Sequence, residues 1–419
     1  MTVRSPAWPF FGWRVVAAAF VLATFGWGVG FYGPPIYLHT VIERTNWPVA
    51  LASAAVTVHF LIGVPVVANM PRLYRRFGMP VVTCVGALLL GLGVFGWAVA
   101  YEPWQLFVAA SLSGCGWVAM GAAAVNALVA QWFVRTRPAA LAAAYNGASI
   151  GGVVFSPLWV ALIAALGFAG GAAVVGVVMV IVMAVLSVLV FSRTPQSMGQ
   201  APDGDAPGQS PASMSLPNTP SLPGRALWRD RAFRTLAAGM ALSLFAQIGL
   251  LAHLYSLLVP AIGKQGAGLA MGSATACAIG GRTIVGWLMP PGADRRRFAA
   301  MNLGVQVAGS LALLAAGGTS VHLLILGVVL FGAGIGNVTS LPPLIAQVEF
   351  VKEDATRVVP LIVGIGQATY AFAPTAFGVL RAFEGAGELF AAQGAMLFIM
   401  AAIVQVSAIT CFLGGRRSP

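Results

Sequence analysis

One arginine lies in the middle of a long apolar stretch. Arg282 is the only Lys or Arg well inside such a stretch, within residues 267–289. Placing its charge in hydrocarbon costs about 2.5–3.5 kcal/mol, so the guanidinium needs a partner or a wet cavity. A guanidinium presents a planar fork that can hold a carboxylate by two parallel hydrogen bonds. We therefore expect Arg282 to bind an anionic ligand; the alternative is an arginine that bonds backbone carbonyls or reaches inward to water.

The acidic residues point the same way. All eleven Asp and Glu residues fall in predicted loops or near the ends of the apolar stretches. Arg282 thus has no evident counter-ion in the sequence, which favours an anionic ligand over a cationic one and disfavours an Asp/Glu proton relay. Glu349, at the end of one stretch, is the nearest candidate for a relay.

Two histidines are candidates for proton coupling and gating. His59 could change its charge near neutral pH and so couple protons, or it is a neutral core histidine bonded to one neighbour. His253 lies nearer the end of its stretch and is a candidate gating or substrate residue, with an interfacial role as the alternative.

Polar side chains in the middle of apolar stretches can line a cavity. The candidates are Asn126, Tyr145, Asn146, Gln247, Asn337, Gln367 and Tyr370. Each could instead bond a neighbouring helix, which is the commoner fate of amides in membranes. By depth in their stretches, Gln247, Gln367 and Tyr370 are best placed to contact a ligand.

Signs of an enzyme are missing from the sequence. There is no HExxH, no GxxxxGK[ST] and no credible Ser-His-Asp set, and "GVGFYG" matches GxGxxG only inside the first apolar stretch, after no strand. The four cysteines all lie in apolar stretches without a CxxC pair, so they read as small packing residues. We expect no enzymatic activity, no cofactor and no metal.

The stretches that carry these residues are long enough to cross a membrane. Hydrophobic residues make up 59% of the 419, charged residues 8%, and the mean hydropathy is +0.88. A crossing helix needs about 20 apolar residues. The pattern predicts an all-α polytopic membrane protein with twelve crossings at 12–38, 48–70, 80–101, 104–131, 139–166, 168–192, 235–260, 267–289, 299–317, 321–346, 358–381 and 389–413.

The basic residues predict the orientation. Of the 23 Lys and Arg residues, nineteen fall on one side of these spans, only Arg44, Lys264 and Arg381 fall on the other, and Arg282 lies within a span. Because basic loops stay in the cytoplasm, we expect both termini to be cytoplasmic. We expect the protein itself to lie in the inner or plasma membrane. The same topology accounts for the net charge of +12 without nucleic-acid binding.

One long connection divides the chain. Residues 194–234 contain "TPQSMGQAPDGDAPGQSPASMSLPNTPSLPG", rich in Pro, Ser and Gly, and predict a largely disordered cytoplasmic linker. It separates a half at 1–193 from a half at 235–419. "NALVAQWFV" and "PPLIAQVEFV" match in Leu, Ala and Gln, which suggests two related six-helix halves around a midplane site.

Local motifs carry a family resemblance. "FGWRVVAAAF", "GWGVGFYGPPIYL", "WFVRTRPAALAAAYNGASIGG" and "GGRTIVG" occur in the order found in one group of transporters. With its six-plus-six organisation, the chain resembles the major facilitator superfamily, and within it the monocarboxylate-porter and oxalate/formate-antiporter group. The resemblance implies anion transport and supports Arg282 as a substrate residue.

The chain departs from that group at three places. Arg75 stands where the superfamily usually has an acid before "RFG", and Ala278 stands where proton-coupled porters have an Asp. Gln367 and Tyr370 occupy the span in which oxalate-type antiporters have a Lys.

We therefore expect a monomeric secondary transporter of small organic anions, with the bilayer as its surroundings and proton-coupled uptake as its mode. The alternatives are anion exchange, an efflux pump of the same fold for neutral or amphipathic compounds, and a membrane receptor that binds ligand without flux.

Overall fold

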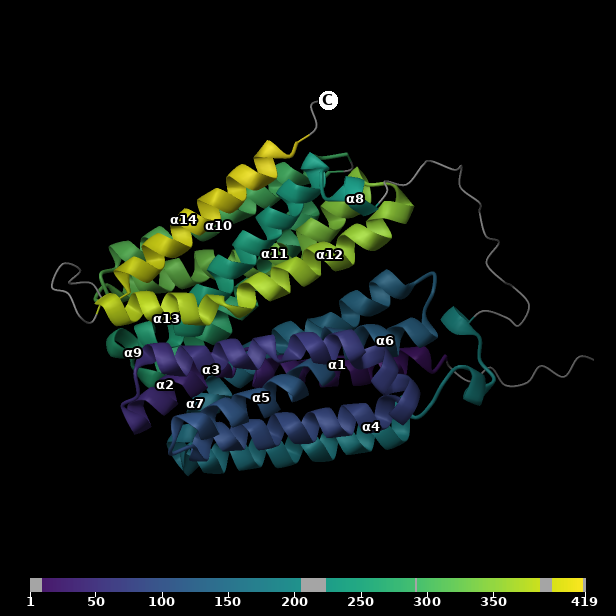
Figure 1. Cartoon of the computed structure of the whole chain (residues 1–419), viewed down its shortest axis with the longest axis horizontal. Helices are drawn as coiled ribbons and strands as arrows, with labels where there is room; N and C mark the ends of the chain where they lie inside the picture. Colours follow the sequence, from purple (N-terminus) through teal and green to yellow (C-terminus); the bar gives the residue numbers. More distant parts are fainter. Residues whose placement is uncertain (1–9, 205–223, 291, 385–393, 417–419) are drawn as a thin grey trace, which may run out of the picture. The chain divides into compact units, whose positions relative to one another are not determined.

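The computed structural model describes residues 10–204, 224–290, 292–384 and 394–416, and within them every regular element is a helix (Figure 1). The helices are α1 (Gly12–Gly30), α2 (Pro34–Thr45), α3 (Val49–Leu61), α4 (Gly63–Val99), α5 (Pro103–Ala119), α6 (Ala122–Trp132), α7 (Arg137–Leu186), the π-helical η1 (Ser187–Phe191), the 3-10 turns η2 (Gln196–Met198) and η3 (Pro202–Gly204), α8 (Gly224–Leu227), α9 (Arg231–Leu288), α10 (Arg295–Ala315), α11 (Val321–Glu349), α12 (Lys352–Ala371), α13 (Ala373–Glu384) and α14 (Ala395–Gly414).

Three of the longest helices are interrupted by a single glycine. The interruptions are Gly78 (φ 80°, ψ 157°), Gly167 (φ 71°, ψ 168°) and Gly263 (φ 70°, ψ 170°), a backbone region that is essentially reserved for glycine. Without Gly263, the 58 residues of α9 would form a rod about 87 Å long, far more than about 30 Å of hydrocarbon. In the described residues nine helical stretches are long and apolar enough to span a membrane, and dividing three of them at these glycines gives the twelve crossings expected from the sequence.

Four spans are also broken part-way. The breaks fall at residues 31–33 between α1 and α2, at Ile62 between α3 and α4, at 120–121 between α5 and α6, and at Phe372 between α12 and α13. Irregular backbone at membrane depth is tolerated where it is buried in protein or lines a cavity. The breaks therefore mark candidate positions for a site.

The chain forms two compact units, which are described separately. Unit 1 draws on Met1–Tyr32, Ile62–Gly151 and Leu166–Leu216, and unit 2 on Gly33–Leu61, Gly152–Ala165 and Pro217–Pro419. The units therefore do not follow the division of the sequence into halves, because α2, α3 and the middle of α7 belong with α9 and α13. The pseudo-repeat with halves at 1–193 and 235–419 stays a prediction.

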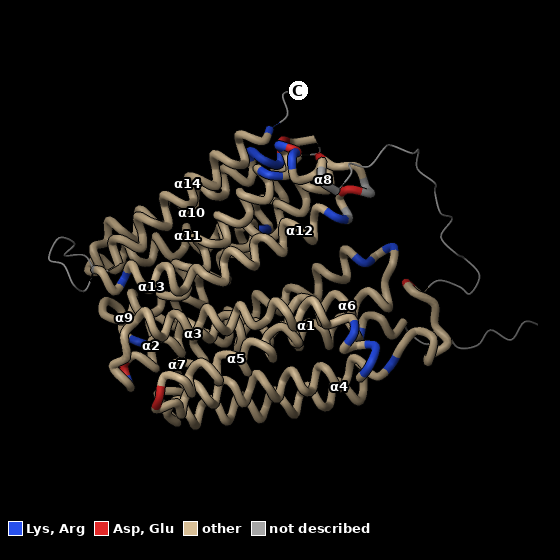
Figure 2. Tube along the Cα trace, in the orientation of Figure 1, with Lys and Arg blue, Asp and Glu red and all other residues tan. Residues whose placement is uncertain are grey.

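In unit 1, helix backbones approach each other closely. A Cβ at Gly116 of α5 would lie 2.5 Å from the Gly86 oxygen of α4, and a Cβ at Gly151 of α7 would lie 2.5 Å from the Thr24 oxygen of α1. Within each unit, Lys and Arg gather mostly at one end of the helices (Figure 2). This distribution agrees with the one-sided charge pattern of the sequence.

The first part of the predicted linker forms the short turns η2 and η3, and a largely disordered linker stays a prediction. Asp203 accepts hydrogen bonds from the backbone N–H groups of Val134 (3.0 Å), Arg135 (2.8 Å) and Thr136 (3.0 Å) and from the Thr136 hydroxyl (2.6 Å). Burial raises the pKa of Asp203, but these hydrogen bonds outweigh it and lower the pKa to about 2. The carboxylate thus fastens η3 to the start of α7; residues 205–223 of the linker lie outside the described residues.

In unit 2, α9, α10, α11, α12 and α14 lie side by side (Figure 1). Their core includes Phe233, Leu303, Ile345 and Phe412, with Ile362 of α12 fully buried among them.

The single-residue interruptions give a direct test. We expect Gly167→Ala and Gly263→Ala each to destabilise the protein by about 1–3 kcal/mol, because Ala avoids this backbone region. Nothing lies within 4 Å of a Cβ built at either position, so the effect comes from the backbone alone. The measurement is thermal unfolding of the purified protein in detergent.

Gly304→Ala is the matched control, because Gly304 is helical in α10 and its Cβ would also meet nothing within 4 Å. It should leave stability unchanged or raise it slightly. Equal losses in all three variants would mean that the conformation of the interruptions does not matter.

Candidate functional site

Arg282 of α9 contacts the backbone of α11. Its Nε and Nη2 both donate to the Gly336 carbonyl oxygen, each over 3.3 Å, and the side chain is half-buried. A Cβ at Gly336 would lie 3.1 Å from both nitrogens and 2.6 Å from the Ala278 oxygen. Glycine at 336 therefore makes the room in which the guanidinium lies.

The carbonyl that holds Arg282 is shared. Thr339 and Ser340 direct their hydroxyls to the same Gly336 oxygen, over 3.2 Å and 3.1 Å. A carbonyl oxygen has two lone pairs. Four donors therefore compete for one acceptor, and the bonds to Arg282 are correspondingly long.

Two of the candidate amides bond neighbouring helices. The Gln247 oxygen accepts from Gln306 Nε2 of α10 at 3.2 Å, and both side chains are buried. Asn337 of α11 donates to Asn302 Oδ1 at 2.9 Å, and Asn302 donates to the Gly334 oxygen at 3.1 Å. These amides lie in the packing between α9, α10 and α11, which was the alternative the sequence left open.

Their partners on α10 were not identified from the sequence. Asn302, Gln306 and Ser310 recur every four residues and therefore share one face of α10. That spacing was the available signal. Ser310 extends the row by donating to Gln405 Oε1 of α14 at 3.1 Å.

The remaining candidates of unit 2 lie around α3 and α12. The Tyr370 ring packs edge-on against Phe60 of α3, with 5.6 Å between centroids, and Gln367 is half-buried one turn earlier in α12. His59 is 2% exposed, and its ring lies edge-on to Phe60 at 5.1 Å. The burial of His59 agrees with either a core role or a coupling role.

His253 lies in a tight seam between α3, α9 and α13. Its Nε2 lies 3.1 Å from the Pro374 oxygen, and its fully buried Nδ1 meets no hydrogen-bond partner within the described residues. Beside it, Thr375 donates to the Thr57 hydroxyl over 2.7 Å, and Gly378 packs against Ser53. The seam therefore joins a helix near the start of the chain to two helices near its end.

An ion cluster joins α2, α9 and α13. Lys264 donates to Glu43 over 2.8 Å, His39 Nε2 lies 3.3 Å from the same carboxylate, and the His39 ring packs edge-on against Tyr255. Arg381 of α13 donates to the Ser256 hydroxyl. Lys264 and Arg381 are two of the three basic residues that the sequence assigned to the less basic side.

In unit 1, Asn126 and Tyr145 form a pair. Asn126 Nδ2 donates to the Tyr145 hydroxyl and to the Ala122 oxygen, over 2.8 Å in each case. Tyr145 donates to the same Ala122 oxygen over 3.3 Å. Asn146 is exposed on a different face of α7, in a row with Ala142, Ile150 and Val154, and does not join this pair.

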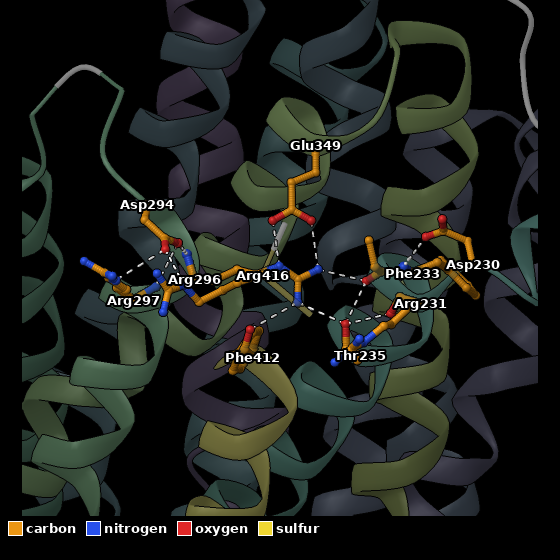
Figure 3. A network of polar contacts seen from close by, with 11 residues as sticks. Asp230, Arg231, Phe233, Thr235, Asp294, Arg296, Arg297, Glu349, Phe412 and Arg416 are labelled. Atoms are coloured by element: carbon orange, nitrogen blue, oxygen red, sulfur yellow. Dashed lines mark hydrogen bonds and ion pairs between the residues drawn. The ribbon is translucent and has the colours of Figure 1, made fainter. Parts of the chain in front are cut away.

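The most extensive polar network involves an arginine that the sequence placed in a loop. Arg296 is 1% exposed and binds Glu349 through Nε (2.6 Å) and Nη2 (2.8 Å) (Figure 3). Nη2 also donates to the Ala232 oxygen, and Nη1 to Thr235 and the Phe412 oxygen. All five donors are used, and they tie α10 to α11, α9 and α14. Glu349 is thus an ion-pair partner in the structure, where the sequence had suggested a relay.

Comparison with known proteins agrees with this architecture. Residues 15–374 match the family model for the major facilitator superfamily. The chain belongs to the major facilitator superfamily. Members of this superfamily are transporters, so the expectation of a multi-pass membrane transporter is confirmed at this level.

Individual relatives are distant. The MFS transporter asaE of Aspergillus flavus is 27% identical over 204 residues, 46% of this chain and 44% of that protein. Among solved structures, a bacterial homolog of the human lysosomal transporter Spinster, inward-facing and occupied, has a TM-score of 0.72 at 15% identity, covering 98% of this chain and all of the other. A point mutant of the nucleoside transporter NupG has a TM-score of 0.71 at 13% identity, covering 96% of this chain and all of the other. At such identities the structures establish the shared fold alone.

The buried ion pair predicts a large stability effect. Glu349→Gln should cost about 3–5 kcal/mol, because it leaves the Arg296 charge buried without its counter-charge. The readout is thermal unfolding in detergent.

The control is Asp294→Asn. Asp294 is partly exposed, pairs with Arg416 at 2.6 Å and caps α10. Asn still caps, so the loss there should stay below about 1 kcal/mol. A smaller loss for Glu349→Gln than for Asp294→Asn would contradict this account.

The seam predicts a second effect. A Cβ at Gly378 would collide with the Ser53 hydroxyl and lie 3.5 Å from His253 Cε1. We expect Gly378→Leu to part α3 from α13 and to raise the labelling of a Thr57→Cys reporter by a water-soluble maleimide several-fold. Gly364→Leu on α12, where a Cβ meets nothing within 4 Å, should leave the labelling rate unchanged. Unchanged labelling in Gly378→Leu would mean that the seam tolerates a side chain.

Proposed function

We propose that this superfamily member is a monomeric secondary active transporter that carries small organic anions of the monocarboxylate class across the cell membrane by alternating access. The observation that carries the proposal is the environment of Arg282. Arg282 is a half-buried guanidinium on a membrane-spanning helix, and its bonds to the Gly336 carbonyl are long and shared with two hydroxyls, so a carboxylate can take the place of that carbonyl.

The energetics favour this exchange. A hydrogen bond between charged groups contributes about 1.5–3 kcal/mol, compared with about 1 kcal/mol for a neutral one. A carboxylate would bring two such bonds and a full counter-charge to Arg282, and it would leave Gly336 to the hydroxyls of Thr339 and Ser340.

Several of the chain's own carboxylates are engaged elsewhere. Glu43 pairs with Lys264, Glu349 with Arg296 and Asp294 with Arg416. Asp230 caps α9 through the Phe233 N–H, and Asp203 holds the start of α7. Each of these five carboxylates therefore has a role of its own in holding the fold.

Alternating access requires surfaces that part. The seam of α3 with α9 and α13, closed by small residues and hydroxyls, has the composition of such a surface. We infer that it is the outer gate, with His253 at its centre. This assignment rests on the basic residues, which put both termini in the cytoplasm and Lys264 and Arg381 outside.

Entry of an anion against a negative membrane potential needs compensating charge. Proton symport supplies this charge, and we propose His59 as the proton carrier. His59 is buried beside Phe60, whose ring also packs against Tyr370. Exchange for a second anion would balance charge without a proton. We propose Gln367 and Tyr370 on α12, and Gln247 and Asn337, which also bond α10, as further contributors to the pathway in unit 2. In unit 1 we propose Asn126, Tyr145 and Asn146.

The test is uptake of a labelled panel of monocarboxylates and dicarboxylates into proteoliposomes, with and without an inward proton gradient. Arg282→Gln should reduce uptake about 10- to 100-fold, which corresponds to the loss of a charged hydrogen bond of about 1.5–3 kcal/mol. Arg282→Lys should fall between, because it keeps the charge and loses the fork.

Thr283→Val on the exposed neighbouring position is the matched control and should transport as wild type does. Dependence on the gradient separates symport from exchange. Absence of carboxylate flux from folded wild-type protein would overturn the proposal and favour efflux of neutral or amphipathic compounds.

A further inference from the structure

Four aromatic side chains meet in unit 1, from α1, α5 and α7. The Trp27 ring lies 5.0 Å from Trp117 and 5.9 Å from Tyr145 between centroids, edge-on to both. Phe31 lies 5.9 Å from Trp117. We call these four residues, together with Asn126 of α6, the aromatic patch.

The patch lies where two broken spans touch. At the end of α1, the Trp27 oxygen accepts both the Phe31 N–H (3.0 Å) and the Tyr32 N–H (2.8 Å), so the helix stops there. The break between α5 and α6 lies at 120–121, directly after Trp117, and a Cβ at Gly26 of α1 would lie 2.7 Å from the Met120 oxygen. Transporters place substrate sites at such discontinuities of membrane helices.

The polar edge of the patch offers acceptors. Because both Asn126 Nδ2 and the Tyr145 hydroxyl are directed at the Ala122 oxygen, which can only accept, the orientation of the amide is fixed with its nitrogen toward Ala122. Both Nδ2 hydrogens are used. Asn126 Oδ1 accepts no hydrogen bond from any group in the described residues, so it is available to a donor.

The patch is unlike the lipid-facing surface of the same unit. The exposed row on α4 runs through Val81, Val85, Leu88 and Leu92 to Phe95 and holds no polar side chain. In the patch, by contrast, Trp27, Phe31, Tyr145 and Asn126 are all partly exposed, and Trp117 closes the base at 8% exposure. Polar side chains inside spans usually face the bundle interior, so Asn126 and Tyr145 mark the polar edge of the patch.

We infer that the aromatic patch binds a flat aromatic ring that carries a hydroxyl or N–H donor at its edge. The ring packs against Trp27, Phe31 and Tyr145, and its donor bonds Asn126 Oδ1. The inference deepens the proposed function, on which it rests for the transport of an organic anion: it adds that the cargo carries a hydroxy- or amino-substituted aromatic ring.

Matched ligands separate the two features. On purified full-length protein in detergent, titration calorimetry compares benzoate with cyclohexanecarboxylate, which has the same size and charge but a puckered ring. It also compares para-hydroxybenzoate with para-fluorobenzoate, which lacks the donor. We expect about tenfold tighter binding of the flat ring and about fivefold tighter binding of the hydroxylated one.

Variants assign each preference to its residues. Trp27→Leu should abolish the flat-ring preference, and Trp27→Phe should restore most of it. Asn126→Leu should abolish the hydroxyl preference and leave the flat-ring preference intact. Ile150→Ala, on the exposed face of α7 away from Tyr145, should change neither. Unfolding temperatures without ligand identify any variant that fails to fold, and Trp27→Met and Asn126→Ser then serve in its place.

The outcomes distinguish this inference from the proposed function. Equal affinities within both ligand pairs, or preferences that survive in Trp27→Leu and Asn126→Leu, would overturn the aromatic patch as a binding site. Phenol against cyclohexanol repeats the comparison without a carboxylate. If phenol binds selectively while no carboxylate is bound or transported, the patch stands and the anion transporter falls. If carboxylates are transported without ring preference, the reverse holds.

Discussion

Direct contact between helix backbones is the constraint on which this structure depends. Lipid tails are as apolar as leucine, so the hydrophobic effect does not drive helices together inside a bilayer, and packing must. Gly116 and Gly151 allow helices to come together in unit 1. In unit 2, Gly332 of α11 does the same, because a Cβ at this position would lie only 2.5 Å from the Ala274 oxygen. Where backbones touch, there is no room for polar side chains, so these gather in small sets elsewhere along the helices.

Two arginines show what such sets do. Arg296 uses all five of its N–H donors and joins four helices. Four of these donors make hydrogen bonds of 3.1 Å or less, two to the Glu349 carboxylate, one to a hydroxyl and one to a carbonyl. Arg282 directs two of its donors to the Gly336 carbonyl, each over 3.3 Å, and shares that carbonyl with two hydroxyls. The first arrangement leaves nothing for a ligand to improve, whereas in the second a carboxylate would be a better partner than the carbonyl. Similar chemistry thus supports a structural joint in one place and a proposed binding site in another.

The sequence predicted the fold better than the site. Hydropathy and length are enough to locate membrane helices, because each helix must satisfy its own backbone hydrogen bonds. Phe133 and Phe350 directly follow α6 and α11 in the same extended conformation, and their positions agree within one residue with the repeat seen in the sequence. Partners across helices depend on rotation and depth, which one sequence does not specify. Hence the sequence named Gln247 as a candidate without its partner Gln306, and it assigned Arg296, which is buried, to a loop.

The one-residue interruptions at Gly167 and Gly263 also limit how this protein can be handled. A connection of a single glycine has no slack, so an epitope tag, protease site or fluorescent domain inserted at either point would have to pull two packed helices apart. Reporters of topology belong instead in longer connections, such as the segment that follows Gly204. Because these two connections are so short, we expect insertions at Gly167 and Gly263 not to be tolerated.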